Sequence, residues 1–303
     1  MAEQPAIETS GLSKTYPGGV QALSGLDLRL EHGEVLGFLG PNGAGKSTTI
    51  RLLLDLIRPT AGAARILGLN AQVDSVEVRR QVGYVPGDLR LSDQLTGREQ
   101  LDSLVRLRGS VDRSLRDELC RRFGVVLDRP IRALSRGNRQ KIGLVQAFMH
   151  RPQVLVLDEP TSGLDPLLQE EFRVLLRETA DDGRAVFLSS HSLDEVQHVA
   201  DRVAIIRAGR LVAVESVDSL RDKALRHVTI RFAGPADPVP FAELAGVQVE
   251  SIDGDVLRVS APEAAMDGVV KAAARSTIVD LVSAPADLEE IFLDRYREVG
   301  DGR

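Results

Sequence analysis

The stretch that decides the fold is Gly40-Pro41-Asn42-Gly43-Ala44-Gly45-Lys46-Ser47, which satisfies the P-loop pattern. Its glycines let the backbone curl, so that several N–H groups can point at phosphate oxygens at the positive end of the following helix. The ammonium of Lys46 can bridge the β- and γ-phosphates of a nucleotide, and the hydroxyl of Ser47 can ligate Mg²⁺. The stretch therefore predicts a site for a nucleoside triphosphate with Mg²⁺.

The sequence on both sides of this loop supplies the context that a P-loop needs. Residues 34–39 predict a strand that runs straight into the glycines. From Ser47 the apolar spacing becomes helical through Leu56, until Pro59 stops it. Because strand, glycine loop and helix form the unit in which P-loops occur, a chance glycine-rich loop is a poor alternative.

Other apolar runs predict the rest of a sheet. Residues 154–157 and 185–188 are apolar without alternation, as expected of parallel strands that are buried on both faces. Residues 203–206 and 211–214 flank a short turn that contains a glycine and predict two more strands. The core of the chain is therefore expected to be α/β.

Two carboxylates, Asp158 and Glu159, end the apolar strand at residues 154–157. Ligands collect at the carboxyl ends of parallel strands, so these side chains should face the phosphate site. Asp158 would then hold Mg²⁺, directly or through water, and Glu159 would polarise the attacking water as general base. Taken alone, the pair fits a solvated acidic turn before Pro160 equally well.

The composition places limits on function. The chain has 303 residues, of which 43% are hydrophobic and 27% charged, which is typical of a globular protein with a substantial core. The formal net charge of −6 argues against a protein whose main partner is nucleic acid, and we expect no nucleic-acid partner. The single cysteine, Cys120, permits no internal disulfide. No apolar stretch approaches the roughly 18 residues of a membrane span.

The chain divides into segments of different character. Residues 88–150 are helical in pattern and rich in arginine, which indicates an inserted helical subdomain. The charged residues 218–226 indicate a connector. Beyond it, a strand at 227–232, a hairpin around Asp253-Gly254, a helix at 264–274, a strand at 278–282 and a helix at 288–296 predict a small α+β module.

We therefore expect an α/β P-loop NTPase with a mixed sheet core, an inserted helical subdomain at about residues 88–150 and a small C-terminal α+β domain. The expected boundaries are 1–220 for the nucleotide-binding domain and 221–303 for the small C-terminal domain.

Further motifs carry a resemblance to a known family. They are Leu134-Ser135-Arg136-Gly137-Asn138-Arg139-Gln140, Ser162-Gly163-Leu164-Asp165, His191 after the strand at 185–188, and Tyr16 near the N-terminus. From about residue 7 to residue 215 the chain resembles the nucleotide-binding subunit of ABC transporters, with the motifs in that family's order and at its usual intervals.

The resemblance implies a role for each matching residue. Tyr16 would stack on adenine, and the less favoured alternative is a tyrosine at a strand edge with no role in binding. His191 would contact the γ-phosphate, and Asp165 would communicate between two sites. Ser135 and Gly137 would close over the γ-phosphate that is bound to a second subunit. The resemblance assigns nucleotide binding to the whole P-loop and the residue after it: Gly40, Pro41, Asn42, Gly43, Ala44, Gly45, Lys46, Ser47 and Thr48.

The same resemblance implies an activity and partners. The chain would hydrolyse ATP with Mg²⁺, form a head-to-tail homodimer and drive a separate transmembrane subunit from the cytoplasmic face of the membrane. The C-terminal module, above all residues 287–293, is similar to the accessory domain of some bacterial ABC-2-type exporter ATPases, which implies export. The alternative is a non-transport ABC ATPase that acts on ribosomes or DNA. An unrelated P-loop kinase or GTPase fits neither the signature loop at 134–140 nor His191.

Two positions depart from the family pattern. Gly87 stands where the family usually has a glutamine that touches Mg²⁺, which predicts weaker Mg²⁺ coordination or altered coupling. Arg136 replaces a glycine of the signature loop, and Asn138 replaces a glutamine. Arg136 could reach the nucleotide, but we expect it to face solvent or the partner surface, because Ser135 and the backbone already serve the phosphate.

Overall fold

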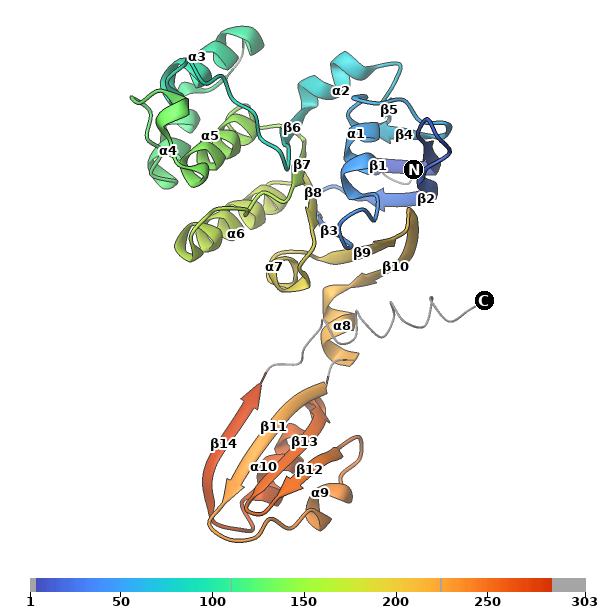
Figure 1. Ribbon diagram of the computed structural model, residues 1–303, viewed down its shortest axis with the longest axis vertical. Helices are drawn as coiled ribbons and strands as arrows, with labels where there is room; N and C mark the ends of the chain where they lie inside the picture. Colours follow the sequence, from blue (N-terminus) through green and yellow to red (C-terminus); the bar gives the residue numbers. More distant parts are fainter. Residues whose placement is uncertain (1–3, 110, 224, 285–303) are drawn as a thin grey trace. The chain divides into compact units, whose positions relative to one another are not determined.

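The computed structural model describes residues 4–109, 111–223 and 225–284, which form two compact units that divide between Val214 and Glu215 (Figure 1). The first unit is the P-loop α/β fold that the sequence predicts. Its main sheet has six strands in the order β10 (Arg210–Ser216), β9 (Arg202–Arg207), β3 (Val35–Leu39), β8 (Ala185–Ser190), β7 (Val154–Asp158) and β6 (Val82–Val85).

The direction of these strands positions the site. β6 pairs with β7, β7 with β8, β8 with β3, and β3 with β9, all in parallel. Every residue of β3, β7 and β8 is buried, which explains why their sequences are apolar without alternation. Because the three strands are parallel, the segments that follow them emerge at one edge of the sheet.

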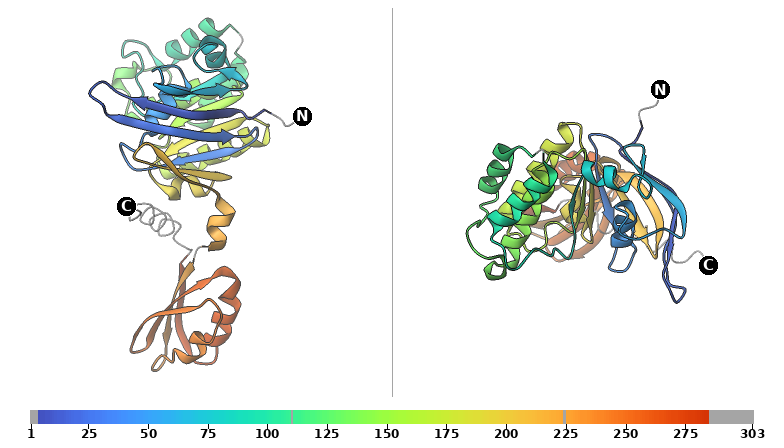
Figure 2. Two further views of the ribbon diagram at one scale, coloured as in Figure 1. Left: turned by 90° about the vertical axis from the view of Figure 1, so that its right-hand side faces the viewer. Right: turned by 90° about the horizontal axis from the view of Figure 1, so that it is seen from above.

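A second, antiparallel sheet completes the first unit, and Figure 2 shows both sheets from two further directions. Its order is β2 (Gln21–Leu30), β1 (Ile7–Thr15), β4 (Ala61–Ile66) and β5 (Leu69–Asn70). One apolar core joins the two sheets to helix α1 (Lys46–Leu53), and in it the rings of Phe38 and Phe187 lie 5.1 Å apart. Helix α2 (Ser75–Gln81) leads into β6.

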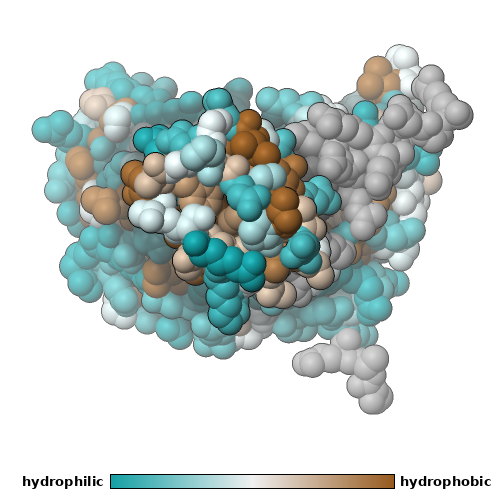
Figure 3. All heavy atoms as spheres, turned by 90° about the horizontal axis from the view of Figure 1, so that it is seen from below, coloured by the Kyte–Doolittle hydropathy of each residue, from teal (hydrophilic) through white to brown (hydrophobic). Residues whose placement is uncertain are grey.

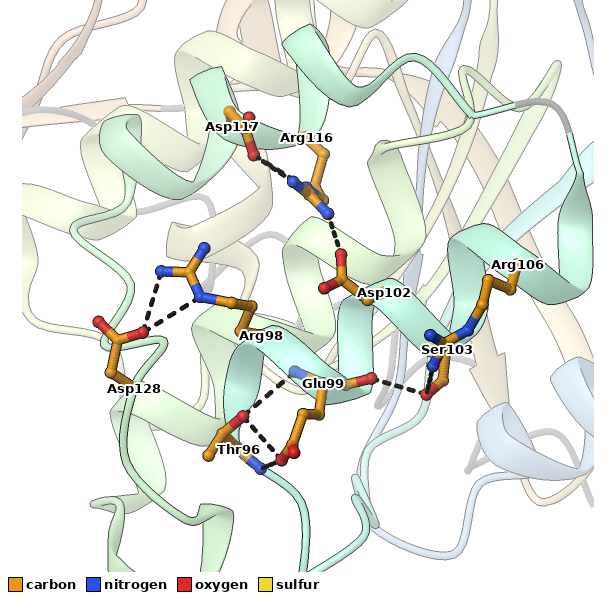
Figure 4. Close-up of polar contacts among 9 residues, drawn as sticks. All are labelled: Thr96, Arg98, Glu99, Asp102, Ser103, Arg106, Arg116, Asp117 and Asp128. Atoms are coloured by element: carbon orange, nitrogen blue, oxygen red, sulfur yellow. Dashed lines mark hydrogen bonds and ion pairs between the residues drawn. The ribbon is translucent and has the colours of Figure 1, made fainter.

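The expected helical insertion is present. It contains α3 (Gly97–Arg108), α4 (Arg113–Arg122), the 3₁₀ turn η1 (Ile131–Ala133) and α5 (Arg136–Phe148) (Figure 1). Figure 4 shows polar contacts that stabilise this insertion. Thr96 and Glu99 form a capping box at the start of α3. The largely buried guanidinium of Arg116 on α4 lies between Asp117 and Asp102 of α3, so it ties the two helices together.

Two helices return to the sheet after β7 and β8. They are α6 (Pro166–Asp181) and the short α7 (Leu193–Gln197). In the part of the chain that the structure describes, no helix is both long enough and apolar enough to span a bilayer.

The second unit is a small α+β module built on a four-stranded antiparallel sheet. The sheet order is β12 (Gln248–Asp253), β13 (Val256–Pro262), β11 (Leu225–Phe232) and β14 (Ile278–Ala284). Helices α9 (Val239–Ala242) and α10 (Met266–Ala273), with the turn η2 (Glu263–Ala265), contribute to its own apolar core. Large apolar side chains also remain exposed, among them Ile252 and Val282, and Figure 3 shows apolar residues interspersed with polar ones on the molecule seen from below.

One sequence expectation for this unit is wrong. The charged residues 218–226 are not a plain connector, because helix α8 spans Val217–Lys223 and β11 begins at Leu225. Val217 and Leu220 are buried and lie three residues apart, so they share one face of that helix. The expected helix at 288–296 lies outside the described residues.

Candidate functional site

The P-loop connects β3 to α1 in a conformation that requires glycine. Gly45 caps α1 with a φ of 115°, in the left-handed region that disfavours other residues. A Cβ on Gly40 would lie 2.4 Å from the carbonyl oxygen of Ile206, so the loop passes too close to β9 for any side chain. Of the remaining predicted loop residues, Pro41, Asn42 and Gly43 are exposed at the tip, Ala44 is buried and Thr48 is half-buried.

Lys46 reaches back across this loop. Its ammonium donates hydrogen bonds to the carbonyl oxygens of Gly40 at 2.5 Å and Pro41 at 3.3 Å. Burial lowers the pKa of the ammonium, and the nearby carboxylates of Glu159 and Asp158 oppose that shift. The hydrogen bonds from this buried ammonium to loop carbonyls can be exchanged for the stronger ones that phosphate oxygens offer.

Asp158 ends β7 and is buried with both carboxylate oxygens engaged. Oδ2 accepts a hydrogen bond from the hydroxyl of Ser47 at 2.9 Å, and Oδ1 accepts one from Ser189 at 2.5 Å. Hard oxygen donors that converge beside a phosphate loop are the kind of ligand that Mg²⁺ takes, usually one or two per site, together with water and phosphate. Ser47 and Asp158 therefore fit a Mg²⁺ site. A Cβ on Gly87 would lie 3.3 Å from Asp158 Oδ2, so this departure from the family pattern borders that site.

Glu159 joins the same cluster from a strained backbone. Its φ is 47°, unusual for a residue with a side chain, and its N–H donates to the carbonyl oxygen of Ser189 at 3.1 Å. Glu159 Oε1 lies 3.8 Å from the ammonium of Lys46 and 3.3 Å from Nδ1 of His191. The segments after β3, β7 and β8 thus bring a cation, a carboxylate and an exposed imidazole to one point, as their sequence positions predict.

The second cluster consists of Ser135 and Gly137 at the start of α5 and Asp165 just before α6, two segments that meet where Gly137 approaches the carbonyl oxygen of Gly163. Ser135 caps α5 by accepting a hydrogen bond from the N–H of Asn138 at 3.3 Å. Asp165 caps α6 in the same way, with the N–H of Leu168 at 3.0 Å. Both predicted residues therefore also stabilise helix ends in the single chain.

Tyr16 follows β1 and is half-buried. The ammonium of Lys14 lies 5.4 Å from the centre of its ring, a cation–π arrangement, and its N–H donates to the carbonyl oxygen of Val20. One face of the ring thus has a partner within the chain.

From the sequence we expected Arg136 to face solvent or the partner surface, and the structure adds a contact within the chain. The Arg136 side chain is exposed, but Nη2 donates a hydrogen bond of 2.6 Å to the hydroxyl of Ser162 in the same chain. A Cβ on Gly163 would lie 3.4 Å from Arg136 Cγ, so the arginine stem covers that glycine.

The sequence analysis missed three polar residues around the site. Ser189 donates to Asp158, the buried amide of Gln140 donates to the carbonyl oxygen of Pro160 at 2.8 Å, and Glu195 accepts from Thr161 at 3.1 Å. Ser189 could have been predicted from the sequence, because it is a polar residue at the end of the otherwise apolar strand β8. The other two depend on contacts between distant segments.

Comparisons with known proteins agree with this geometry. A family described as "ABC transporter" matches residues 23–162. The chain is 40% identical over 228 residues to the daunorubicin/doxorubicin resistance ATP-binding protein DrrA of Streptomyces peucetius. This match covers 73% of this chain and 69% of that protein. The chain is 35% identical over 303 residues to the daunorubicin resistance ATP-binding protein DrrA3 of Streptomyces coeruleorubidus, covering 95% of each.

Solved structures show the same fold. A structure described as the ATP-binding subunit of an ABC transporter matches 72% of this chain and 92% of its own, with a TM-score of 0.67 and 29% identity. The dimeric ABC transporter cassette MJ0796 matches 70% of this chain and 98% of its own, with a TM-score of 0.64 and 23% identity. Sequence, site geometry and fold thus agree, and the chain belongs to the ABC transporter family as one of its ATP-binding, ATP-hydrolysing subunits.

Proposed function

We propose that this ATPase powers export through a separate transmembrane subunit, to which it binds at the cytoplasmic face of the membrane. Two copies would associate head to tail when ATP binds and separate after hydrolysis. The main support for ATP hydrolysis at this site is the position of Glu159, whose carboxylate lies between the ammonium of Lys46 and the imidazole of His191.

The first cluster consists of the side chains gathered at the P-loop: Lys46, Ser47, Asp158, Glu159 and His191. Each would have a separate role in hydrolysis. Lys46 would neutralise the β- and γ-phosphates, and Ser47 and Asp158 would hold Mg²⁺, which stabilises the negative charge of the phosphates when it is bound. Glu159 would orient a water molecule and take its proton while the water oxygen bonds to the γ-phosphorus and the bond to the ADP oxygen breaks. His191 would contact the γ-phosphate beside that carboxylate.

The second cluster would act on the partner's nucleotide. Ser135 and Gly137 would close over the γ-phosphate that is bound to the other copy, and Asp165 would sit where the two copies meet. The N-terminus of α5, to which both Ser135 and Gly137 belong, is a favourable environment for an anion. Tyr16 would offer its ring to the adenine base.

The exported compound is proposed from the names of the relatives. Two similar proteins are named for daunorubicin resistance, and a third, 34% identical over 240 residues, is the bacitracin transport ATP-binding protein BcrA of Bacillus licheniformis. We therefore propose an antibiotic-like compound as the exported substrate. The C-terminal unit would assist dimerisation or modulate activity.

The Glu159→Gln variant tests the site and the dimer together. Loss of the base should reduce hydrolysis by about 10²- to 10⁴-fold while ATP binding persists. Sedimentation of this variant should show a dimer with Mg-ATP and a monomer without it, and adding Ser135→Arg should abolish the dimer. Glu170→Gln, a change on the exposed surface of α6, is the matched control and should behave as wild type.

Three results would contradict the proposal. A chain that is monomeric with Mg-ATP, or dimeric without nucleotide, rules out association driven by ATP alone. Co-purification with ribosomes in place of a polytopic membrane protein would replace transport with a role in translation.

A further inference from the structure

The signature loop and the loop after Glu159 pack against each other within one chain. A Cβ on Gly137 would lie 2.6 Å from the carbonyl oxygen of Gly163, so only glycine permits this approach. Beside it, Arg136 covers Gly163 with its stem and donates its 2.6 Å hydrogen bond to Ser162. The two loops therefore meet in a close backbone contact with one side-chain hydrogen bond at its edge.

Ser162 connects this contact to the proposed catalytic base. Its own N–H donates to the carbonyl oxygen of Glu159 at 3.3 Å, which closes a short turn. On the buried side, Gln140 of the same helix as Arg136 donates to Pro160. Helix α5 thus forms two hydrogen bonds to the segment 159–162, a buried one from Gln140 and an exposed one from Arg136.

We propose that Arg136 is a positioning residue, which fixes Glu159 through Ser162 and does not contact nucleotide. The inference rests on the proposed head-to-tail dimer. There, Ser135 and Gly137 would serve the partner's ATP while Glu159 serves the chain's own, so the bond between Arg136 and Ser162 would couple the two ATP sites. The guanidinium has five N–H donors, but the 2.6 Å bond and the packing of the stem hold it on its own chain.

The test is a double-mutant cycle in the full chain. Arg136→Met keeps the stem and removes the donors, while Ser162→Ala removes the acceptor. Each change should lower the kcat of ATP hydrolysis by about three- to tenfold, the worth of one hydrogen bond, and leave KM within about twofold. The double variant should be no slower than either single variant, because both remove the same bond. Arg113→Met, an exposed arginine at the start of α4, is the matched control and should leave kcat unchanged.

Three outcomes would overturn this role. Additive effects of the two changes would mean that the residues act independently. A raised KM for Arg136→Met, with Ser162→Ala unaffected, would place the guanidinium on the nucleotide. Unchanged kcat in both single variants would make the bond irrelevant to hydrolysis.

A second measurement separates this proposal from the proposed function. In the Glu159→Gln background, Arg136→Met should still dimerise with Mg-ATP, and its loss of the dimer would contradict a role confined to positioning. Failure of Glu159→Gln itself to dimerise would refute the head-to-tail function instead.

Discussion

Lowering the pH from 8 to 5 should destabilise the N-terminal unit through one imidazole, His150. The ring lines a cavity of about 180 Å³ with Tyr84 and Arg108, and its Nε2 lies 3.2 Å from the carbonyl oxygen of Val82. Burial, with a smaller contribution from the guanidinium of Arg108, lowers the pKa of His150 from 6.5 to about 4. Carbonyl groups of Val82 and Gln146 oppose the shift without cancelling it.

The sign and size of the effect follow from proton linkage. Between about pH 6.5 and 4 the unfolded chain holds a proton on His150 that the folded chain does not, so acid favours unfolding. The stability contributed by the neutral ring is complete above pH 6.5 and is lost as the pH falls toward 4. At pH 5 the loss from this one group is about 2 kcal/mol.

Urea unfolding followed by circular dichroism at pH 8 and pH 5 measures this loss. The wild-type chain should lose about 2 kcal/mol more between the two pH values than His150→Gln does. His198→Gln, which changes an exposed imidazole, is the control and should follow wild type. Equal pH dependence of wild type and His150→Gln would refute the reasoning, because it would mean that the half-buried ring titrates as it does in the unfolded chain.

Three further changes test the site. Ser189→Ala removes a hydrogen bond from the buried carboxylate of Asp158, so urea titration should show about 1–3 kcal/mol less stability, and an unchanged midpoint would contradict this. Gly137→Ala forces the backbone at Gly163 to move, so ATPase activity should fall at least about tenfold, whereas wild-type turnover would mean that the loop tolerates displacement. Gly87→Gln would add a side chain that can touch Mg²⁺, so the Mg²⁺ concentration that gives half-maximal ATPase activity should fall by about threefold. If that concentration and the coupling to transport both stay the same, the hypothesis of weakened coordination fails.

The sequence was sufficient for the first cluster because strand patterns fix where residues emerge. Asp158, Glu159 and His191 each follow an apolar run, and parallel strands deliver such residues to one edge of a sheet. The P-loop adds Lys46 at the same edge. The direction of the strands was enough for Asp158 and Glu159, whereas His191 was singled out by the family resemblance.

The sequence was insufficient where a contact depends on how two distant segments approach. Arg136 has many rotamers, and its bond to Ser162 exists only because the backbone of Gly137 passes against Gly163. Strand β4 has the sequence AGAARI, which carries little intrinsic strand preference, and it forms because it pairs with β1.

Helix α8 is a different kind of error, since the signal was available. Its charged residues suggested a connector, yet Val217 and Leu220 have the spacing of one helix face.

The backbone at Glu159 links stability to activity in this chain. A left-handed φ on a residue with a side chain costs about 1–2 kcal/mol, so neighbouring contacts must hold it in place. Gln140 from α5 holds Pro160, and Glu195 from α7 holds Thr161. Glu195 also accepts a hydrogen bond of 2.7 Å from Ser190 at the end of β8, the strand that leads to His191.

These contacts give the proposed base two independent supports. One comes from α5, the helix that begins with the signature loop, and the other from Glu195 of α7, which also bonds Ser190 at the end of β8. A shift of α5 relative to β8 therefore cannot leave the segment that begins at Glu159 where it is, because the segment is bonded to both. The position of Glu159 is therefore sensitive to the state of the signature loop.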